Sequence, residues 1–165
     1  VIALTRFGML EPDCPEVRAT VAAVHRSLWC QSASGGIARY EHDEYQRQTQ
    51  DREGAPGNPW FITTLWLAQY YASVAATREE LAQARALLDW AVSHAQETGL
   101  LPEQIHPETG APLSVSPLVW SHAEYVAAVL EYVAAGQRLS MGRRSFDPTP
   151  GPSASGLRMT DKRAA

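Results

Sequence analysis

Apolar residues recur along the chain with helical spacing, in segments that polar connections separate. The segment from Glu16 to Trp29 carries an apolar residue at every third or fourth position: Val17, Val21, Val24 and Leu28. This stripe predicts a helix that packs through a single face. The polar connection QSASGGIARYEHDEYQRQTQDREGAPGN follows, and its glycines, prolines and charges cannot form a core of their own.

A second helix is predicted to begin at Pro59 with Asn58 as its cap, because proline suits the first helical position and an asparagine oxygen can accept from the first turn. Its sequence, WFITTLWLAQYYASVAA, is apolar around most of its circumference, so we expect it to be buried on nearly all sides. A third helix, predicted from Arg78 to Glu97 and stopped by Gly99, should pack through one face. That face consists of Leu81, Ala84, Leu87, Leu88, Ala91 and Val92.

The connection LLPEQIHPETGAPLSVS leads to a fourth predicted helix, with Ser116 as its cap and Pro117 at its first position. This helix should run from Leu118 to about Ala135 and end at Gly136, and it is apolar or small on most sides. One-faced helices thus alternate with helices that should be buried. Such alternation is typical of an all-α barrel with inner and outer helices, whose long loops open at one end.

Composition narrows the classes of function. A chain of 165 residues, 45% of them hydrophobic, is long enough to bury one sizeable core. A net charge of −4, a pI near 5.7 and scattered basic residues argue against a nucleic-acid partner. No apolar run reaches the roughly 20 residues that a membrane span requires.

Three further features concern the context of the chain. Cys14 and Cys30 have neither metal-site spacing nor the number that a disulfide framework needs, so reduced thiols in a bacterial-type cytoplasm are the simplest interpretation, with one bridge as the alternative. Residues 141–165 are rich in Pro, Gly, Ser and charge, which predicts a disordered tail. The chain starts at Val1 without a signal-peptide pattern, and we expect it to be a piece of a longer protein.

Three blocks, GGIARYEHDEY, GNPWFITTLWLAQYY and GLLPEQIHPETGAPLSVSPLVWSHAEY, resemble in order the signature blocks of glycoside hydrolase family 15. That family includes glucoamylases, glucodextranases and some bacterial trehalases. The resemblance implies a partial (α/α)6 barrel, the six-hairpin toroid, in which residues 1–140 are the C-terminal part of the catalytic domain. It also implies an α-linked gluco-oligosaccharide or trehalose as substrate, without a cofactor.

In this family one carboxylic acid protonates the glycosidic oxygen while a second carboxylate activates the attacking water, with inversion. By its place in LLPEQ, Glu103 resembles the catalytic base, and the general acid should lie upstream of this chain. Arg39 and Asp43 match positions that bind sugar hydroxyls, with a simple ion pair within the loop as the alternative. Trp60 matches a tryptophan that can line the sugar pocket, with a place in the core as the alternative. Trp120 and His122 should support the Glu103 loop, although these are expectations from the resemblance alone.

Other carboxylates and histidines in the loops are weaker candidates. Glu41, Glu44 and Glu108 are available as partners of Glu103, but the family pattern places no acid there and loop glutamates are usually solvated. The histidines, among them His94, His106 and His122, form no pair or cluster with zinc-site spacing, so no metal is expected.

Two interpretations of the function remain. In the first, the chain supplies the base to an enzyme that hydrolyses α-glucosidic bonds, and is inactive alone. In the second, it is a truncated helical module that binds carbohydrate or protein without catalysis. In either case, helices meant for the inside of a barrel would expose Trp60, Trp66, Tyr70 and Val126 in the isolated chain, so we expect it to self-associate. The segment RQTQDREGAP is longer and more charged than the short turn that the family pattern predicts, which leaves the choice of substrate open.

Overall fold

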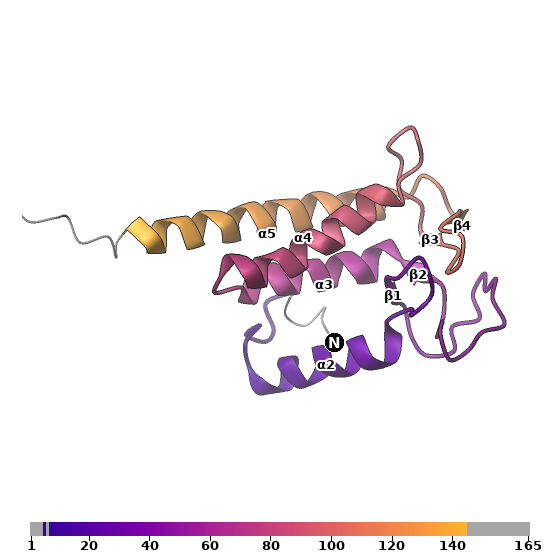
Figure 1. Cartoon of the computed structure of the whole chain (residues 1–165), viewed down its shortest axis with the longest axis horizontal. Helices are drawn as coiled ribbons and strands as arrows, with labels where there is room; N and C mark the ends of the chain where they lie inside the picture. The colour runs from indigo at the N-terminus through magenta and orange to yellow at the C-terminus, as the bar shows by residue number, and fades with distance from the viewer. Residues whose placement is uncertain (1–4, 6, 145–165) are drawn as a thin grey trace, which may run out of the picture.

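The computed structural model describes residue 5 and residues 7–144. Within them the chain forms four helices and, at one end of the helices, a small antiparallel sheet (Figure 1). Helix α3 packs against both α4 and α5, which also contact each other. Helix α2 packs its buried valines into the same core cluster. The helices are α2 (Pro15–Leu28), α3 (Phe61–Val74), α4 (Arg78–Ser93) and α5 (Val119–Arg144).

Helix α3 is buried on nearly all sides, as its sequence predicts. Phe61, Leu65 and Leu67 are fully buried, and so is the polar Thr64. The Thr64 hydroxyl accepts a hydrogen bond of 2.9 Å from the backbone N–H of Ile37, so burial leaves it satisfied. The central helix therefore takes its stability from packing against neighbours rather than from an exposed polar face.

The start of α3 differs from the prediction. Pro59 and Trp60 form the short strand β2, and the helix begins at Phe61. Asn58 does not cap the helix, because the cap position is Trp60 and Asn58 lies two residues before it, with its side-chain N–H2 donating to Gln46 and Gln104. The free N–H of Phe61 donates to the Glu103 carbonyl at 3.2 Å. The backbone of a neighbouring loop thus accepts from the first turn of α3, where the sequence predicted a side-chain cap.

Helix α4 packs through one face, as predicted, and Thr77 caps it by accepting from the Glu80 N–H. Two details differ. The helix ends at Ser93 rather than at Glu97, and Val92, which was expected on the buried face, is 57% exposed. The His94 N–H satisfies the last turn by donating to the Trp90 carbonyl at 3.2 Å, and a turn then leads to Gly99.

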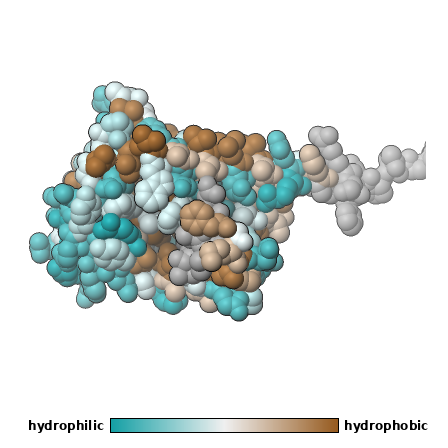
Figure 2. Space-filling model, turned by 180° about the vertical axis from the view of Figure 1, so that it is seen from behind, coloured by the Kyte–Doolittle hydropathy of each residue, from teal (hydrophilic) through white to brown (hydrophobic). Residues whose placement is uncertain are grey.

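Helix α5 is longer and more exposed than predicted. It begins at Val119, passes through Gly136 and continues to Arg144, while Ser116 and Pro117 lie in the preceding loop, joined by a cis peptide bond. Its outer face is not covered within the described chain, and Figure 2 shows hydrophobic residues gathered along the edge that α5 forms. The exposed apolar residues of α5 are Val119, Trp120, Val126, Leu130, Val133 and Met141.

Of the aromatic and apolar residues expected to be exposed in the isolated chain, Trp60 and Tyr70 are in fact buried, at 5% and 7% exposure. Trp66 is half-buried. The prediction of an exposed inner face holds for Val126, which is 58% exposed. Among the four residues, only Val126 of α5 is therefore exposed.

The small sheet was not predicted, because strands of two residues have no periodicity to detect. Its strands are β1 (Ile37–Ala38), β2 (Pro59–Trp60), β3 (Gln104–Ile105) and β4 (Pro112–Leu113), paired in chain order and antiparallel throughout. Trp60 pairs with Ile37 on one side and with Gln104 on the other. The two long loops, one before α3 and one before α5, are thereby joined at one end of the helices (Figure 1).

Cys14 and Cys30 are free thiols. Burial raises the pKa of the Cys30 thiol to about 12, and its S–H donates to the Gly57 carbonyl at 3.4 Å. Helix α5 extends four residues into the segment expected to be a disordered tail, and residues 145–165 lie outside the described residues. None of the helices in the described part of the chain has the length and apolar character needed to cross a bilayer.

Candidate active site

The sheet brings the two candidate loops to one place. Arg39 follows β1 directly, Trp60 lies in β2, and Glu103 immediately precedes β3. Because Trp60 pairs with both Ile37 and Gln104, the residues next to those partners must lie on either side of it. Residues that are far apart in the sequence thus share one end of the helical core.

Arg39 and Asp43 form a forked ion pair. Arg39 donates from Nε to Asp43 Oδ2 at 3.0 Å and from Nη2 to Asp43 Oδ1 at 2.9 Å. The Asp43 side chain is 1% exposed, whereas that of Arg39 is 36% exposed. The hydrogen bond to Asp43 raises the pKa of Arg39 above its usual value. Asp43 also accepts from the Tyr45 backbone N–H at 3.0 Å, so a buried carboxylate holds both the loop and the guanidinium.

Aromatic rings surround the Arg39 guanidinium. It lies 4.4 Å from the ring centroid of Trp60 and 5.3 Å from that of Tyr45, within the range of cation–π contact. Trp60 is buried, and its Nε1–H has no acceptor among the described residues. Arg39 therefore covers a face of the Trp60 ring, which the sequence analysis expected to line the sugar pocket. In this structure the ring packs against the Arg39 guanidinium.

Glu103 is held by both its backbone and its side chain. Its N–H donates to the Val115 carbonyl at 2.9 Å, and its carbonyl accepts from Phe61. The half-buried carboxylate accepts from the Ser114 hydroxyl, and Gln104 Nε2 donates to the same oxygen at 3.3 Å. A partly solvated carboxylate with two neutral donors and no ion pair among the described residues is suited to accept a proton from water.

Contacts link Glu103 to the Arg39 loop. The Tyr45 hydroxyl lies 3.3 Å from the Ser114 hydroxyl, which in turn donates to Glu103. The ring of the same Tyr45 lies 6.2 Å from that of Trp60. Tyr45 therefore connects the arginine and its platform to the serine beside the carboxylate.

The loop that carries Glu103 rests on the first turns of α5. His122 Nε2 accepts from the Leu101 N–H at 3.0 Å, and Ser121 donates to the Pro102 carbonyl at 2.8 Å. Trp120 lies elsewhere: it is 51% exposed, its ring meets that of Trp66 edge-on, and its Nε1–H donates to Glu124 at 3.2 Å. No contact between Trp120 and the Glu103 loop is seen among the described residues.

Backbone strain also concentrates at this end of the molecule. Three non-glycine residues of the described chain have positive φ: His42, Gln46 and Ser114, at 60°, 56° and 61°. Such conformations cost free energy and persist only where the surroundings hold them. His42 and Gln46 flank the Asp43–Tyr45 segment, and Ser114 is the donor to Glu103, so the strain lies beside the candidate site.

The structure thus groups Arg39, Asp43 and Trp60 in direct contact and joins them to Glu103 through Tyr45 and Ser114. Sequence reasoning missed those two linking residues and Ser121, although all three lie inside the resembling blocks. No periodicity or spacing could identify them, because their role depends on which loops the sheet brings together. Among the described residues, no group of three or more His, Cys, Asp or Glu could hold a metal ion.

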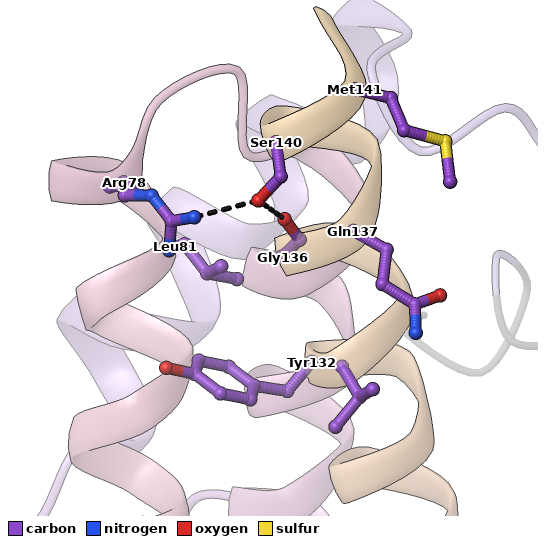
Figure 3. Close-up of a pocket in the computed structure, with 8 residues that line it drawn as sticks. Arg78, Leu81, Tyr132, Gly136, Gln137, Ser140 and Met141 are labelled. Atoms are coloured by element: carbon purple, nitrogen blue, oxygen red, sulfur yellow. Dashed lines mark hydrogen bonds between the residues drawn. The ribbon is translucent and has the colours of Figure 1, made fainter. Parts of the chain in front are cut away.

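A pocket of about 390 Å³ lies elsewhere, between the first turns of α4 and the second half of α5 (Figure 3). There Arg78 donates to the Ser140 hydroxyl at 2.7 Å, and Ser140 donates to the Gly136 carbonyl at 2.8 Å. The pocket is lined by no carboxylate, and it lies at the opposite end of the helices from the sheet. Its lining therefore offers no carboxylate that could act as the acid or the base in glycoside hydrolysis.

Comparisons with known proteins agree with this geometry. The sequence model described as "Glycosyl hydrolases family 15" matches residues 5–130. An uncharacterized glycosyl hydrolase of Methanocaldococcus jannaschii is 34% identical over 134 residues, which cover 76% of this chain and 20% of that protein. A glucoamylase of Clostridium sp. strain G0005 is 32% identical over 130 residues, or 76% of this chain and 18% of that protein.

A trehalase of Mycolicibacterium smegmatis is 30% identical over 132 residues, or 80% of this chain and 18% of that protein. A bacterial glucoamylase whose crystal structure contains acarbose superimposes with a TM-score of 0.68 at 26% identity, over 81% of this chain and 20% of that one. The chain therefore spans about a fifth of the length of these relatives. The family model matches most of the length of this chain, including both long loops, helices α2, α3 and α4, and the first part of α5. This chain therefore belongs to glycosyl hydrolase family 15.

Proposed function

We propose that this chain supplies the catalytic base, Glu103, to a longer enzyme that hydrolyses α-glucosidic bonds with inversion. Residues 1–140 would form the C-terminal part of an (α/α)6 barrel, and segments outside this chain would complete the barrel and contribute the general acid. The chain's length, about a fifth of its relatives, supports this division. The observation that carries the proposal is the joining of the Glu103 loop to the Arg39–Asp43 loop by the sheet.

The chemistry follows from the surroundings of Glu103. An inverting hydrolase needs a carboxylate that takes a proton from water while the water attacks the anomeric carbon, opposite the acid that protonates the leaving oxygen. The Ser114 hydroxyl and the Gln104 amide both donate to one oxygen of Glu103. These bonds leave the other oxygen to receive the proton.

Recognition of the sugar would fall to the Arg39 loop. A guanidinium offers more donors than Asp43 can occupy, and Arg39 is open to solvent on one side. Its free N–H groups suit the neighbouring hydroxyls of a glucose ring, while Trp60 and Tyr45 hold it in place. Relatives named glucoamylase and trehalase make an α-linked gluco-oligosaccharide or trehalose the substrate class that we propose.

The alternative is a helical module that binds carbohydrate or protein without catalysis. It is favoured by the absence of a second carboxylate facing Glu103 in the described chain's hydrogen-bond network. The two functions predict different results for one substitution. A non-catalytic binder would keep its ligand affinity and show no turnover whether or not Glu103 is ionisable.

The test is glucose release from maltooligosaccharides and from trehalose by the whole gene product that carries this chain. Glu103→Gln preserves the shape of the side chain but removes the base, and it should lower kcat by about 10²–10⁴-fold. Glu108→Gln is the matched control, because it makes the same change in the same loop on an exposed residue whose oxygen can still accept from Thr49. It should retain activity.

The product gives a second measurement. Proton NMR of the glucose first released from maltooligosaccharides should show the β-anomer, as inversion requires, whereas trehalose should give one β- and one α-glucose because only the attacked ring changes configuration. An active protein that releases α-glucose from maltooligosaccharides would exclude inversion. Activity that survives Glu103→Gln would exclude Glu103 as the base, and a whole protein without turnover on either substrate would favour the binding module.

A further inference from the structure

The segment 46–57, which the sequence analysis found longer and more charged than expected, is organised by one arginine. Arg47 donates from Nε to the Thr49 carbonyl at 2.9 Å and from Nη1 to the Pro56 carbonyl at 3.2 Å. Its Nη2 donates to the carbonyls of Asp51 and Ala55, at 2.9 and 2.7 Å. Four backbone carbonyls thus converge on one guanidinium, which fixes the shape of the loop from inside.

The fixed loop presents a carbonyl to a buried amide. Gln46, which has a φ of 56°, offers its carbonyl to Asn58 Nδ2 at 2.8 Å. The same Nδ2 donates to Gln104 Oε1 at 2.8 Å. Asn58 is 1% exposed and Gln104 is fully buried, so water cannot replace these bonds.

These contacts determine which way each amide points. A carbonyl oxygen can only accept, so the Asn58 atom that faces Gln46 must be the nitrogen. Since the same atom faces Gln104, Gln104 must present its oxygen to Asn58. Its own nitrogen is then turned toward the Glu103 carboxylate, at 3.3 Å. The orientation of two amides thus follows from one backbone carbonyl.

We propose that Asn58 is a positioning residue for the reaction: it fixes the amide of Gln104 so that Gln104 donates to, rather than repels, Glu103. The inference rests on the proposed function, because it takes Glu103 as the base. Asn58 Oδ1 is buried without a hydrogen-bond partner among the described residues. The contacts of Asn58 are therefore made by its N–H2 group and not by its oxygen.

Asn58→Asp is the discriminating substitution, because it keeps the shape of the side chain and replaces the two donors by acceptors. Gln104 then turns its N–H2 group toward residue 58 and its oxygen toward Glu103. In the whole enzyme we expect kcat to fall about tenfold or more, with KM little changed because Arg39 and Asp43 are untouched. Gln50→Glu is the matched control, since it adds the same charge to an exposed position of the same loop.

A measurement that does not depend on activity follows the Gln104 side-chain N–H2 signals by ¹⁵N–¹H NMR, assigned with Gln104→Glu. In the otherwise unchanged protein, Glu103→Gln should shift these signals, because the N–H2 group faces Glu103. In the Asn58→Asp background the same substitution should leave them unmoved. A merely structural role for Asn58 would not reverse this response.

The outcomes separate the two hypotheses. A whole protein without hydrolytic activity refutes the proposed function, and the NMR comparison still decides whether Asn58 orients Gln104. An active protein in which folded Asn58→Asp keeps its kcat refutes the positioning role. If Asn58→Asp does not fold, Asn58→Ala leaves the Gln104 amide free to turn and should lower kcat less severely. If Glu103→Gln alone, with Asn58 intact, does not shift the Gln104 side-chain signals, the inference is overturned whatever the kinetics of the Asn58 variants.

Discussion

Replacing Asp43 with asparagine should destabilise the chain far more than the same replacement at Asp89, although each aspartate pairs with an arginine four residues earlier. Arg85 Nε donates to both oxygens of Asp89, at 2.8 and 2.9 Å, so the two pairs have similar distances. They differ in burial: the Asp43 side chain is 1% exposed, while those of Arg85 and Asp89 are both 58% exposed.

The magnitude follows from that difference. Breaking a buried ion pair by removing one partner costs about 3–5 kcal/mol, because the remaining charge is left without compensation. Arg39 is 36% exposed and can regain water on its open side, and an asparagine oxygen can still accept one bond. We therefore expect Asp43→Asn to cost about 2–3 kcal/mol, a large part of the ~5–15 kcal/mol that stabilises a typical domain. Asp89→Asn should cause no measurable change, because water already screens that pair.

The assay is urea unfolding of both variants, followed by circular dichroism and by tryptophan fluorescence. The difference in midpoint multiplied by the m-value gives the change in the free energy of unfolding. Equal losses in the two variants would refute the argument, because Asp43 is buried and also accepts from the Tyr45 N–H, whereas Asp89 and its partner are both exposed. In the whole enzyme Asp43→Asn should also raise KM, since it releases the guanidinium that we assign to the sugar.

Three further substitutions probe other parts of the molecule. Ser114→Ala removes the hydroxyl donor to Glu103 and should lower kcat about tenfold, whereas Ser116→Ala, on an exposed residue of the same loop, should not. Because burial raises the pKa of Cys30 to about 12, this thiol should resist iodoacetamide at pH 9 until urea unfolds the chain. The stability that comes from burying the neutral Cys30 thiol is present below pH 9 and is lost as pH rises toward 12. Leu130→Glu places a charge on the exposed apolar face of α5 and should reduce self-association in sedimentation velocity without lowering the unfolding midpoint.

The periodic parts of the fold could be predicted from the sequence, and the boundaries that depend on tertiary contacts could not. Glycine is a residue type that often ends helices, yet α5 continues through Gly136. A Cβ at this position would lie 3.9 Å from Leu81 Cδ2, an ordinary van der Waals distance, and the packing of α5 against α3 and α4 outweighs the roughly 0.5–1 kcal/mol that glycine costs inside a helix. Asn58 is a residue type that often caps helices, but α3 begins only at Phe61, and the Asn58 amide binds Gln46 of its own loop and Gln104 of the next long loop.

The candidate site divides in the same way. Glu103, Arg39 and Asp43 could be proposed because they belong to sequence blocks that resemble a family. Ser114, Tyr45 and Gln104 could not be assigned roles, because nothing local marks a serine, a tyrosine or an amide as the neighbour of a residue far away in the chain. Trp60 shows the limit most clearly: its block was recognised, but only the structure reveals that Arg39 covers its ring.

The bond from the Phe61 N–H to the Glu103 carbonyl ties the order of folding to the geometry of the site. The first turn of the central helix has no side-chain cap, so it is complete only when the Glu103 loop has arrived. Before the Glu103 loop is in place, the first turn of α3 would be frayed. While that turn is frayed, the Glu103 carboxylate would have no fixed position. Unfolding that begins at either element should therefore release both together, and hydrogen exchange at the Phe61 amide would report on the order of the Glu103 loop even in the absence of substrate.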